Sequence, residues 1–162
     1  MEINKIHILG PPGSGKTHLA KELSNKLKLD YFELDNISWE IKYKKKRDIF
    51  EKQILLEKII LNNKWIVEGV QTSFIHSSIN KADKIIFLNF NFFILFYRIF
   101  RRYLFNIKKE NFFRTINLVW IAFNYKIKKG KFQIYKNILN TYDNIVYIKT
   151  KKDLKLFLSR LN

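Results

Sequence analysis

The stretch IHILGPPGSGKTHLAKEL, residues 6–23, decides the fold of this chain. The chain has five glycines and two prolines, and three of these glycines and both prolines lie within residues 10–15. Together with the following Lys and Thr, residues 10–17 match the pattern G-x-x-x-x-G-K-[ST] in full. The apolar residues 5–9 before the match are typical of a buried strand. The leucines after it recur on one face of a helix over residues 17–27.

A loop of this kind binds phosphate groups. Its glycines let the backbone approach a ligand closely, and its successive N–H groups converge on an anion. The helix that follows directs its positive end at the same point. Lys16 is expected to reach the β- and γ-phosphates as a catalytic residue, and the Thr17 hydroxyl to bind Mg²⁺. The expected nucleotide-binding residues are Gly10, Pro11, Pro12, Gly13, Ser14, Gly15, Lys16, Thr17 and His18.

Composition limits the class of protein. A length of 162 residues is typical of a single domain, and 47% hydrophobic and 16% aromatic residues exclude a disordered chain. The absence of cysteine excludes disulfides and thiolate metal sites. No signal-peptide layout is present, and the longest apolar run, residues 85–97, is shorter than the ~20 residues of a spanning helix. We therefore expect a cytoplasmic protein with no membrane partner.

The formal net charge of +17 has two interpretations. A basic surface attracts nucleic acid, anionic membranes or phosphorylated small molecules. Alternatively, the abundance of Lys, Asn, Ile, Phe and Tyr indicates an AT-rich coding sequence, in which lysine accumulates without a polyanionic partner.

Segments with strand and helix patterns alternate along the whole chain. The expected strands are residues 5–9, 31–34, 65–68, 84–89 and 144–149. The expected helices are residues 17–27, 49–62 with Asp48 as N-cap, 91–105, 112–128, 132–140 and 153–160. This alternation predicts an α/β fold with a parallel sheet and right-handed crossovers.

Polar residues follow the expected strands, where ligands of open α/β sheets bind. Glu68 ends the third strand and is expected to hold a water of the Mg²⁺ shell, and Gly69 follows it. Asp35 is expected to orient an acceptor hydroxyl and Arg47 to bind an anionic group. The alternatives are that Asp35 caps a turn and that Arg47 is one more charge in a basic run. Trp39 stacks on a ring of the ligand or packs against the protein.

Arginine is scarce and clustered. Three of the six arginines, Arg98, Arg101 and Arg102, lie within five residues of an expected helix. Residues at these spacings share a helical face, and guanidinium groups bind phosphate oxygens more specifically than lysine does. We therefore predict that the three act on the transferred phosphoryl group. The alternative is a solvated basic face.

Other P-loop classes match the sequence less well. Residues 80–83 and 150–153 imitate the guanine-reading pattern, but no D-x-x-G occurs in the chain. The segment 150–153 is also explained by Thr150 or Asp153 capping the last helix. A motor ATPase needs a hydrophobic strand that ends in Asp-Glu, and none is visible.

The P-loop, YFELD at 31–35, WIVEG at 65–69, ADKIIFL at 82–88 and the arginines at 98–102 resemble the bacterial adenylate-kinase-related P-loop proteins, many of which are named DNA topology modulation proteins. The resemblance implies a nucleoside-monophosphate-kinase-like P-loop NTPase fold with a five-stranded parallel sheet in the order 2-3-1-4-5. It also implies ATP and Mg²⁺ as cofactors and a lid-like helical region at about residues 98–130.

The sequence departs from this family at two places. Val70, Gln71 and Thr72 follow Glu68-Gly69 where adenylate kinases have Phe-Pro-Arg, and Asn89 replaces an acidic strand end. The first departure argues against adenylate kinase activity, and the second removes a carboxylate near the site. We therefore expect a monomeric or dimeric kinase-like phosphotransferase that acts on a small-molecule or nucleotide acceptor. The alternative is an ATP-binding regulatory protein that acts on DNA.

Overall fold

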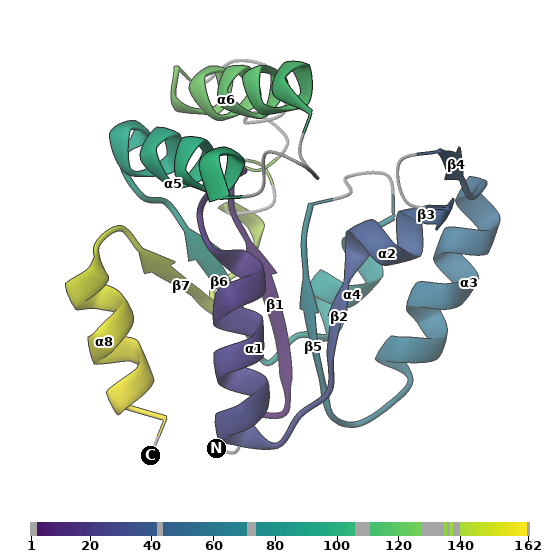
Figure 1. Ribbon diagram of the computed structural model, residues 1–162. Helices are drawn as coiled ribbons and strands as arrows, with labels where there is room; N and C mark the ends of the chain where they lie inside the picture. The colour runs from purple at the N-terminus through teal and green to yellow at the C-terminus, as the bar shows by residue number, and fades with distance from the viewer. Residues whose placement is uncertain are drawn as a thin grey trace. The chain divides into compact units, whose positions relative to one another are not determined.

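The computed structural model of the protein describes residues 3–41, 44–70, 74–105, 111–127, 135, 137 and 140–161 (Figure 1). The chain divides into two compact units. The first comprises Met1–Leu9, Lys16–Phe87 and Asn144–Val146, and the second Gly10–Gly15, Leu88–Asp143 and Tyr147–Asn162. Each unit is described by itself below. The single domain expected from the length stays a prediction.

A five-stranded sheet runs through the chain. Its strands, in spatial order, are β2 (Tyr31–Glu33), β5 (Trp65–Glu68), β1 (Lys5–Leu9), β6 (Lys84–Leu88) and β7 (Ile145–Ile148). Strand β1 is central and pairs in parallel with β5 on one side and β6 on the other, so that Ile6 lies opposite Ile66 and Lys84. Numbered along the chain, the five strands have the order 2-3-1-4-5, and the predicted topology is confirmed.

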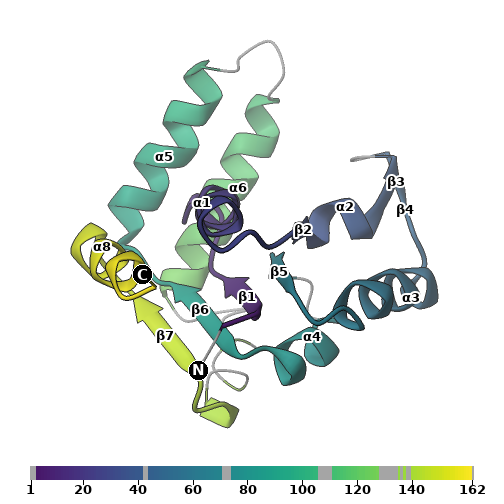
Figure 2. The same cartoon turned by 90° about the horizontal axis from the view of Figure 1, so that it is seen from below.

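Helices of the first unit cover both faces of its strands. Helix α1 (Lys16–Leu27) lies on one side of β1 and β5, and α4 (His76–Lys81) lies on the other side, next to α3 (Ile49–Ile60) (Figure 2). Most side chains between these layers are apolar and buried. This explains why the sequences of the parallel strands are continuous hydrophobic runs. Asp48 caps α3 as predicted, because its carboxylate accepts a hydrogen bond from the Glu51 amide at 2.9 Å.

The second unit is built around two helices. Helix α5 (Phe92–Phe105) packs against α6 (Phe112–Lys126), and α8 (Lys151–Ser159) follows β7. Thr150 and Asp153 form a reciprocal capping box at the start of α8, so the capping interpretation of this segment is confirmed. Among the described helices, none combines the length and the apolar character that crossing a membrane requires.

The structure corrects the sequence interpretation between residues 31 and 48. Strand β2 ends at Glu33, whereas the predicted strand extended to Leu34; this residue begins the short helix α2 (Leu34–Ser38). The segment after it, for which no strand was predicted, contains an antiparallel pair, β3 (Trp39–Ile41) and β4 (Lys45–Lys46). Helix α4 was not predicted. The helix predicted at residues 132–140 lies largely outside the described residues.

Candidate functional site

Residues 10–15 of the P-loop belong to the second unit and form a tight turn after β1. Gly13 has a φ of +77°, and a Cβ atom there would lie 2.8 Å from the Leu95 carbonyl oxygen and from Ile99 Cγ1 of α5. Only glycine therefore allows the loop to adopt this conformation against α5. Ser14 donates its amide to the Pro11 carbonyl at 3.2 Å and closes the turn.

The hydroxyl of Ser14 is an unusual feature of this turn. Ser14 is 1% exposed, and its Oγ has no hydrogen-bond partner among the residues that the structure describes. A buried hydroxyl without a partner is costly, so such an atom within a phosphate-binding loop indicates a ligand oxygen as its partner.

Thr17 and Glu68 meet in the first unit. Thr17 is in the first turn of α1 and Glu68 ends β5, and Thr17 Oγ1 donates a hydrogen bond to Glu68 Oε1 at 2.6 Å. Strand β5 is adjacent to β1, so the sheet order brings these two groups together across 51 residues of sequence. Two oxygen groups in contact at this place are the donor set that Mg²⁺ prefers.

Glu68 is buried, and its surroundings act on its charge in opposite directions. Burial raises the pKa of its carboxyl group, and the nearby carboxylates of Glu33 and Asp35 add to this effect. The charge of Lys16 and the hydrogen bond from Thr17 oppose it. A cation next to Glu68 would therefore stabilise its ionised form.

Gly69 fixes the path of the chain directly after Glu68. Its φ is +126°, and a Cβ atom there would lie 3.0 Å from Leu34 Cβ at the start of α2. Its amide donates to the Ile8 carbonyl at 3.1 Å. Gly69 thus allows α2 to pack close to the end of β5; the predicted contact of Gly69 with a substrate stays a prediction.

Arg98 contacts the P-loop within the second unit. Its Nη1 donates to the Ser14 carbonyl oxygen at 2.8 Å, and the guanidinium lies 4.5 Å from the ring centroid of the buried Phe90. A Cβ atom on Gly15 would be 3.5 Å from the same Nη1. The sequence predicted a phosphate-binding role for Arg98 but not its hydrogen bond to the loop backbone or its stacking on Phe90.

The other two arginines of the cluster lie apart from Arg98 on the surface of α5. Arg101 and Arg102 are exposed, and the guanidinium of Arg101 lies 5.4 Å from the Phe105 ring centroid. The structure therefore brings one of the three arginines to the P-loop. The predicted action of Arg101 and Arg102 on phosphate stays a prediction.

The predicted acceptor residues Asp35, Trp39 and Arg47 all lie in the first unit. Asp35 is exposed in the first turn of α2, close enough to Glu68 to influence its charge. Trp39 is half-buried in β3, and the Lys46 ammonium lies 5.1 Å from its ring centroid. Arg47 Nη1 donates to the carbonyl oxygens of Asn36, Ile37 and Trp39. It thereby supplies hydrogen-bond donors to carbonyl groups at the C-terminal end of α2.

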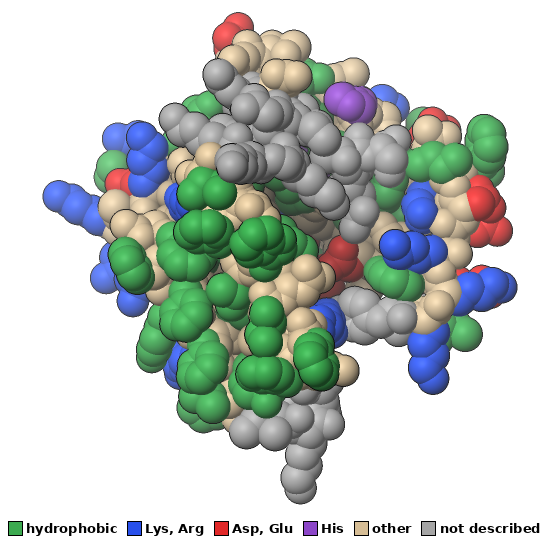
Figure 3. Space-filling view, turned by 90° about the horizontal axis from the view of Figure 1, so that it is seen from above, with side chains coloured by type: hydrophobic (Ala, Val, Ile, Leu, Met, Phe, Trp, Pro, Cys, Tyr) green, Lys and Arg blue, Asp and Glu red, His purple; other side chains and the backbone are tan. Residues whose placement is uncertain are grey.

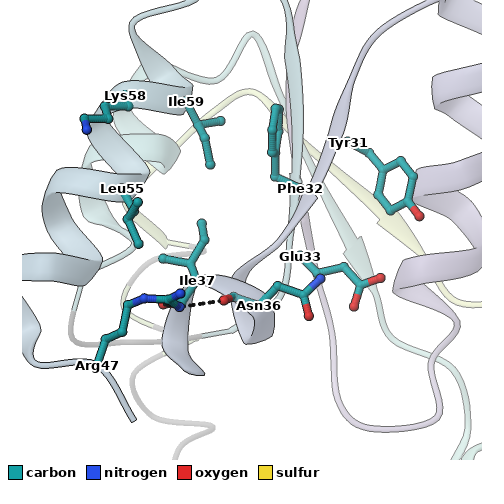
Figure 4. A pocket seen from close by; sticks show the side chains of 9 residues that line it. All are labelled: Tyr31, Phe32, Glu33, Asn36, Ile37, Arg47, Leu55, Lys58 and Ile59. Atoms are coloured by element: carbon teal, nitrogen blue, oxygen red, sulfur yellow. Dashed lines mark hydrogen bonds between the residues drawn. The ribbon is translucent and has the colours of Figure 1, made fainter. Parts of the chain in front are cut away.

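A cavity of about 550 Å³ lies beside this arginine (Figure 4). Its lining residues come from β2, α2, α3 and the segment between β4 and α3: Tyr31, Phe32, Glu33, Asn36, Ile37, Arg47, Leu55, Lys58 and Ile59. The cavity is mainly apolar, with the Arg47 guanidinium at one side, where its bond to the Asn36 carbonyl is drawn. Arg47 is thus the predicted acceptor residue that lines the cavity, whereas Asp35, Trp39 and Glu68 are not among its lining residues.

Two polar contacts near the strand ends were not predicted. His7 is fully buried in β1, and its Nε2 donates to the Gly69 carbonyl oxygen at 3.4 Å. Its Nδ1 has no partner within the described part of the chain, and burial lowers the pKa of His7 to about 4. Beyond the end of β6, Lys126 Nζ donates to Asn89 Oδ1 at 2.7 Å.

These residues fit a magnesium-bound nucleoside triphosphate. The unpartnered Ser14 hydroxyl and the glycine-dependent turn are suited to phosphate oxygens, and the Thr17–Glu68 pair is suited to the metal and its waters. Among the described residues, no group of three His, Cys, Asp or Glu side chains forms an independent metal site.

Solved structures show the same fold. Shikimate kinase from Bacteroides thetaiotaomicron is 17% identical with a TM-score of 0.60, covering 98% of this chain and 96% of that one. A gluconokinase from Sinorhizobium meliloti 1021 is 13% identical with a TM-score of 0.59, covering 99% and 95%. Deoxyadenosine kinase from M. mycoides, solved with bound dCTP, is 19% identical with a TM-score of 0.53, covering 98% of each chain.

Sequence comparison gives one curated relative and one family. The "Uncharacterized protein YqaC" of Bacillus subtilis (strain 168) is 38% identical over 84 residues, which are 51% of this chain and 47% of that protein. The chain thus matches about half the length of this relative. The model of the ATPase family associated with various cellular activities (AAA) matches residues 6–89, from β1 through the P-loop and Glu68 to the end of β6. Because this match covers more than half of the chain, the protein belongs to the ATPase family associated with various cellular activities (AAA).

Proposed function

We propose that the protein is an ATP- and Mg²⁺-dependent phosphotransferase that acts on a small-molecule or nucleotide acceptor, of the adenylate-kinase-related type. The observation that carries the proposal is the hydrogen bond of 2.6 Å between Thr17 Oγ1 and Glu68 Oε1. It couples the last residue of the phosphate loop to a buried carboxylate at a strand end, where phosphoryl-transfer enzymes hold the magnesium of their nucleotide.

In this proposal, each residue of the site has a separate role in binding the nucleotide or the metal. The backbone N–H groups of Gly13 and Gly15 bind the phosphates, and the Ser14 hydroxyl supplies a further donor. Lys16 neutralises charge on the β- and γ-phosphates. Bound Mg²⁺ supplies Lewis-acid stabilisation of the phosphate oxygens. Thr17 and Glu68 provide the oxygens that hold this ion and its waters.

Arg98 supports the proposed transfer from within the same chain. Its hydrogen bond to Ser14 and its position on Phe90 hold the guanidinium beside the loop, where positive charge stabilises a migrating phosphoryl group. The exposed carboxylate of Asp35, which acts electrostatically on Glu68, is the group that we propose orients the acceptor hydroxyl. The similarity of the fold to a shikimate kinase, a gluconokinase and a deoxyadenosine kinase supports a hydroxyl acceptor over hydrolysis alone.

The test is a measurement of ADP formation from Mg²⁺–ATP across nucleosides, nucleoside monophosphates and small hydroxylated metabolites. The proposal predicts one acceptor class that raises turnover well above the rate with water. Lys16→Ala should abolish this turnover, whereas Lys21→Ala, which removes an exposed lysine from the same helix, should not. If no acceptor raises turnover above the rate with water, the phosphotransferase proposal is rejected in favour of an ATP-binding protein without a small-molecule acceptor.

A second candidate, an ATP-binding regulatory protein of the DNA topology modulation type, is favoured by the net charge of +17. DNA binding through phosphate contacts should weaken by orders of magnitude between ~50 and ~200 mM salt. Turnover on a small neutral acceptor should change far less over this range. A Lys16→Ala variant that still binds DNA but no longer consumes ATP would show that the two activities are not coupled.

A further inference from the structure

Helices α5 and α6 expose large apolar side chains instead of burying them. On α6 the buried positions are Thr115, Ala122 and Tyr125, whereas Phe113 is 79% exposed and Trp120 59% exposed. A helix of a water-soluble protein normally turns its large apolar residues toward the core. Helix α6 instead exposes its large aromatic residues, so we expect a binding partner to bury this face.

The exposed residues form one surface across both helices. On α5, Phe93, Phe96, Tyr97, Phe100 and Leu104 recur every three or four positions along the exposed side. On α6, Phe112, Ile116, Trp120, Phe123 and Ile127 do the same. We refer to these ten residues, together with Phe113, as the aromatic face. Figure 3 shows hydrophobic side chains gathered in a broad area of this surface.

Ring contacts make the aromatic face continuous. On α5, Phe92 contacts Phe96 with ring centroids 6.3 Å apart, and Phe96 stacks on Phe100 at 6.0 Å. Between the helices, the ring centroids of Phe92 on α5 and Phe123 on α6 lie 5.6 Å apart. On α6, Phe123 in turn stacks on Trp120. A continuous apolar patch of this extent on one helix pair marks an interaction surface rather than scattered exposed residues.

The charges of the same two helices identify the partner. Helices α5 and α6 together carry Arg98, Arg101, Arg102, Arg114 and Lys126 and contain no Asp or Glu. Arg98 and Lys126 bond within the unit to Ser14 and Asn89. Arg101 is exposed, and its guanidinium lies 5.4 Å from the Phe105 ring centroid, so its long side chain can extend along an apolar surface to reach an anion.

We propose that the aromatic face binds the surface of an anionic lipid bilayer, with the two helices lying in the plane of the interface. Aromatic and aliphatic side chains on one side of a helix, with flanking arginines and no carboxylates, are the features of interfacial helices. This proposal is independent of the proposed phosphotransferase and departs from the expectation of no membrane partner.

Two other possible partners of the aromatic face, a second copy of the chain and single-stranded nucleic acid, agree less well with these observations. A symmetric dimer through the aromatic face would place two cationic surfaces without carboxylates against each other, which is unfavourable. Single-stranded nucleic acid stacks its bases on aromatic rings, but Ile116, Ile127 and Leu104 offer hydrocarbon rather than stacking partners.

The experiment is co-sedimentation of the full chain with vesicles of phosphatidylcholine alone and with vesicles that also contain phosphatidylglycerol. The wild-type chain should bind the anionic vesicles, and the emission of Trp120 should shift to the blue on binding. The double variant Phe113→Ser/Trp120→Ser should reduce binding about tenfold or more. Phe50→Ser, which removes a 72% exposed ring from α3 outside the aromatic face, is the matched control and should bind as wild type. Arg101→Gln should weaken binding to anionic vesicles, and added salt should do the same.

Circular dichroism of each variant verifies that its fold is retained. The proposal is overturned if the double variant binds vesicles as the wild type does. It is also overturned if light scattering shows a stable dimer that the double variant dissociates while no form binds vesicles. Salt-sensitive binding of single-stranded DNA that the double variant abolishes, without vesicle binding, would overturn it in favour of nucleic acid.

Discussion

The Thr17 hydroxyl donates to the Glu68 carboxylate at 2.6 Å, although the two residues are separated by 51 positions in the sequence. The contact exists because β5 is adjacent to β1 in the sheet, so the end of β5 lies beside the start of α1. The bond joins the P-loop motif to a buried carboxylate at a strand end, and it is the first target for mutation.

Glu68→Gln should separate catalysis from stability. The amide oxygen still accepts from Thr17, but the charge that holds Mg²⁺ and its waters is lost, so Mg²⁺-dependent ADP formation should fall about tenfold or more. Because burial raises the pKa of Glu68, the folded chain binds this proton more readily than the unfolded chain does, and ionisation at neutral pH opposes folding. The variant should therefore unfold at a higher temperature.

Calorimetry and a steady-state assay measure the two effects of Glu68→Gln. Glu57→Gln, on the exposed side of α3, is the control and should change neither quantity. A Glu68→Gln enzyme with unchanged Mg²⁺-dependent turnover would contradict the assignment of Glu68 to the metal site.

Arg98→Ala should weaken nucleotide binding. It removes the charge-assisted hydrogen bond to the Ser14 carbonyl and the stacking on Phe90, and such bonds are worth enough to change affinity about tenfold or more. Arg98→Lys keeps the charge but loses the planar fork, so its affinity should be intermediate. Titration with a fluorescent ATP analogue measures both, and Arg160→Ala at the end of α8 serves as the control.

The same titration tests the other predicted arginines. If Arg101 and Arg102 act on the transferred phosphoryl group, their alanine variants should lower kcat and leave ATP affinity unchanged. Equal affinity of Arg98→Ala and wild type would show that the contact with Ser14 is not part of the nucleotide site.

Local patterns were sufficient to predict the P-loop and the parallel sheet, whereas the strand order was predicted from the family resemblance. Short apolar runs bounded by glycine or a polar residue marked β1 and β5, and apolar periodicity marked α1 and α3. The partner of Thr17 was within reach of the same reasoning, since Glu68 is the polar end of an apolar strand. The sequence also placed Arg98 on a helix near the site.

Features that depend on tertiary contacts could not be predicted in this way. Helix α2 begins at Leu34 because this side chain packs on Gly69, a contact that no local pattern encodes. The strand pair β3–β4 lies in a lysine run with no β-sheet signal, and its pairing places Lys46 over Trp39. Periodicity identified α5 and α6 as amphipathic, but it does not tell which side of a helix is covered.

Arg47 offers a test between a structural role and an acceptor-binding role. Its Nη1 donates hydrogen bonds to three carbonyl oxygens around the end of α2. Arg47→Ala should therefore lower the free energy of unfolding by about 1–3 kcal/mol. Arg47→Lys should recover only part of this loss, since one ammonium group does not reproduce the guanidinium geometry. Chemical denaturation provides the measurement, with Lys44→Ala as the control from the same basic run.

Acceptor kinetics distinguish the two roles of Arg47. A structural role predicts reduced stability in both Arg47 variants. An anion-binding role predicts a raised KM for an anionic acceptor with stability unchanged, and this result would contradict the structural interpretation.

His7 should make the protein sensitive to acid. Burial lowers the pKa of His7 to about 4, well below the 6.5 of an unperturbed histidine, so the unfolded chain binds this proton more readily than the folded chain. Stability should therefore decrease as the pH falls from about 6.5 toward 4, by up to about 3 kcal/mol from this residue. Above this window the histidine is neutral in both states and contributes no pH dependence.

Denaturation curves at a series of pH values check the His7 prediction. In His7→Leu the loss of stability between pH 6.5 and 4 should become distinctly smaller, because the group that must take up a proton is absent. His18→Gln removes an exposed histidine next to the P-loop and should keep the wild-type slope. If His7→Leu and the wild type lose stability in parallel over this range, the acid sensitivity arises from other groups.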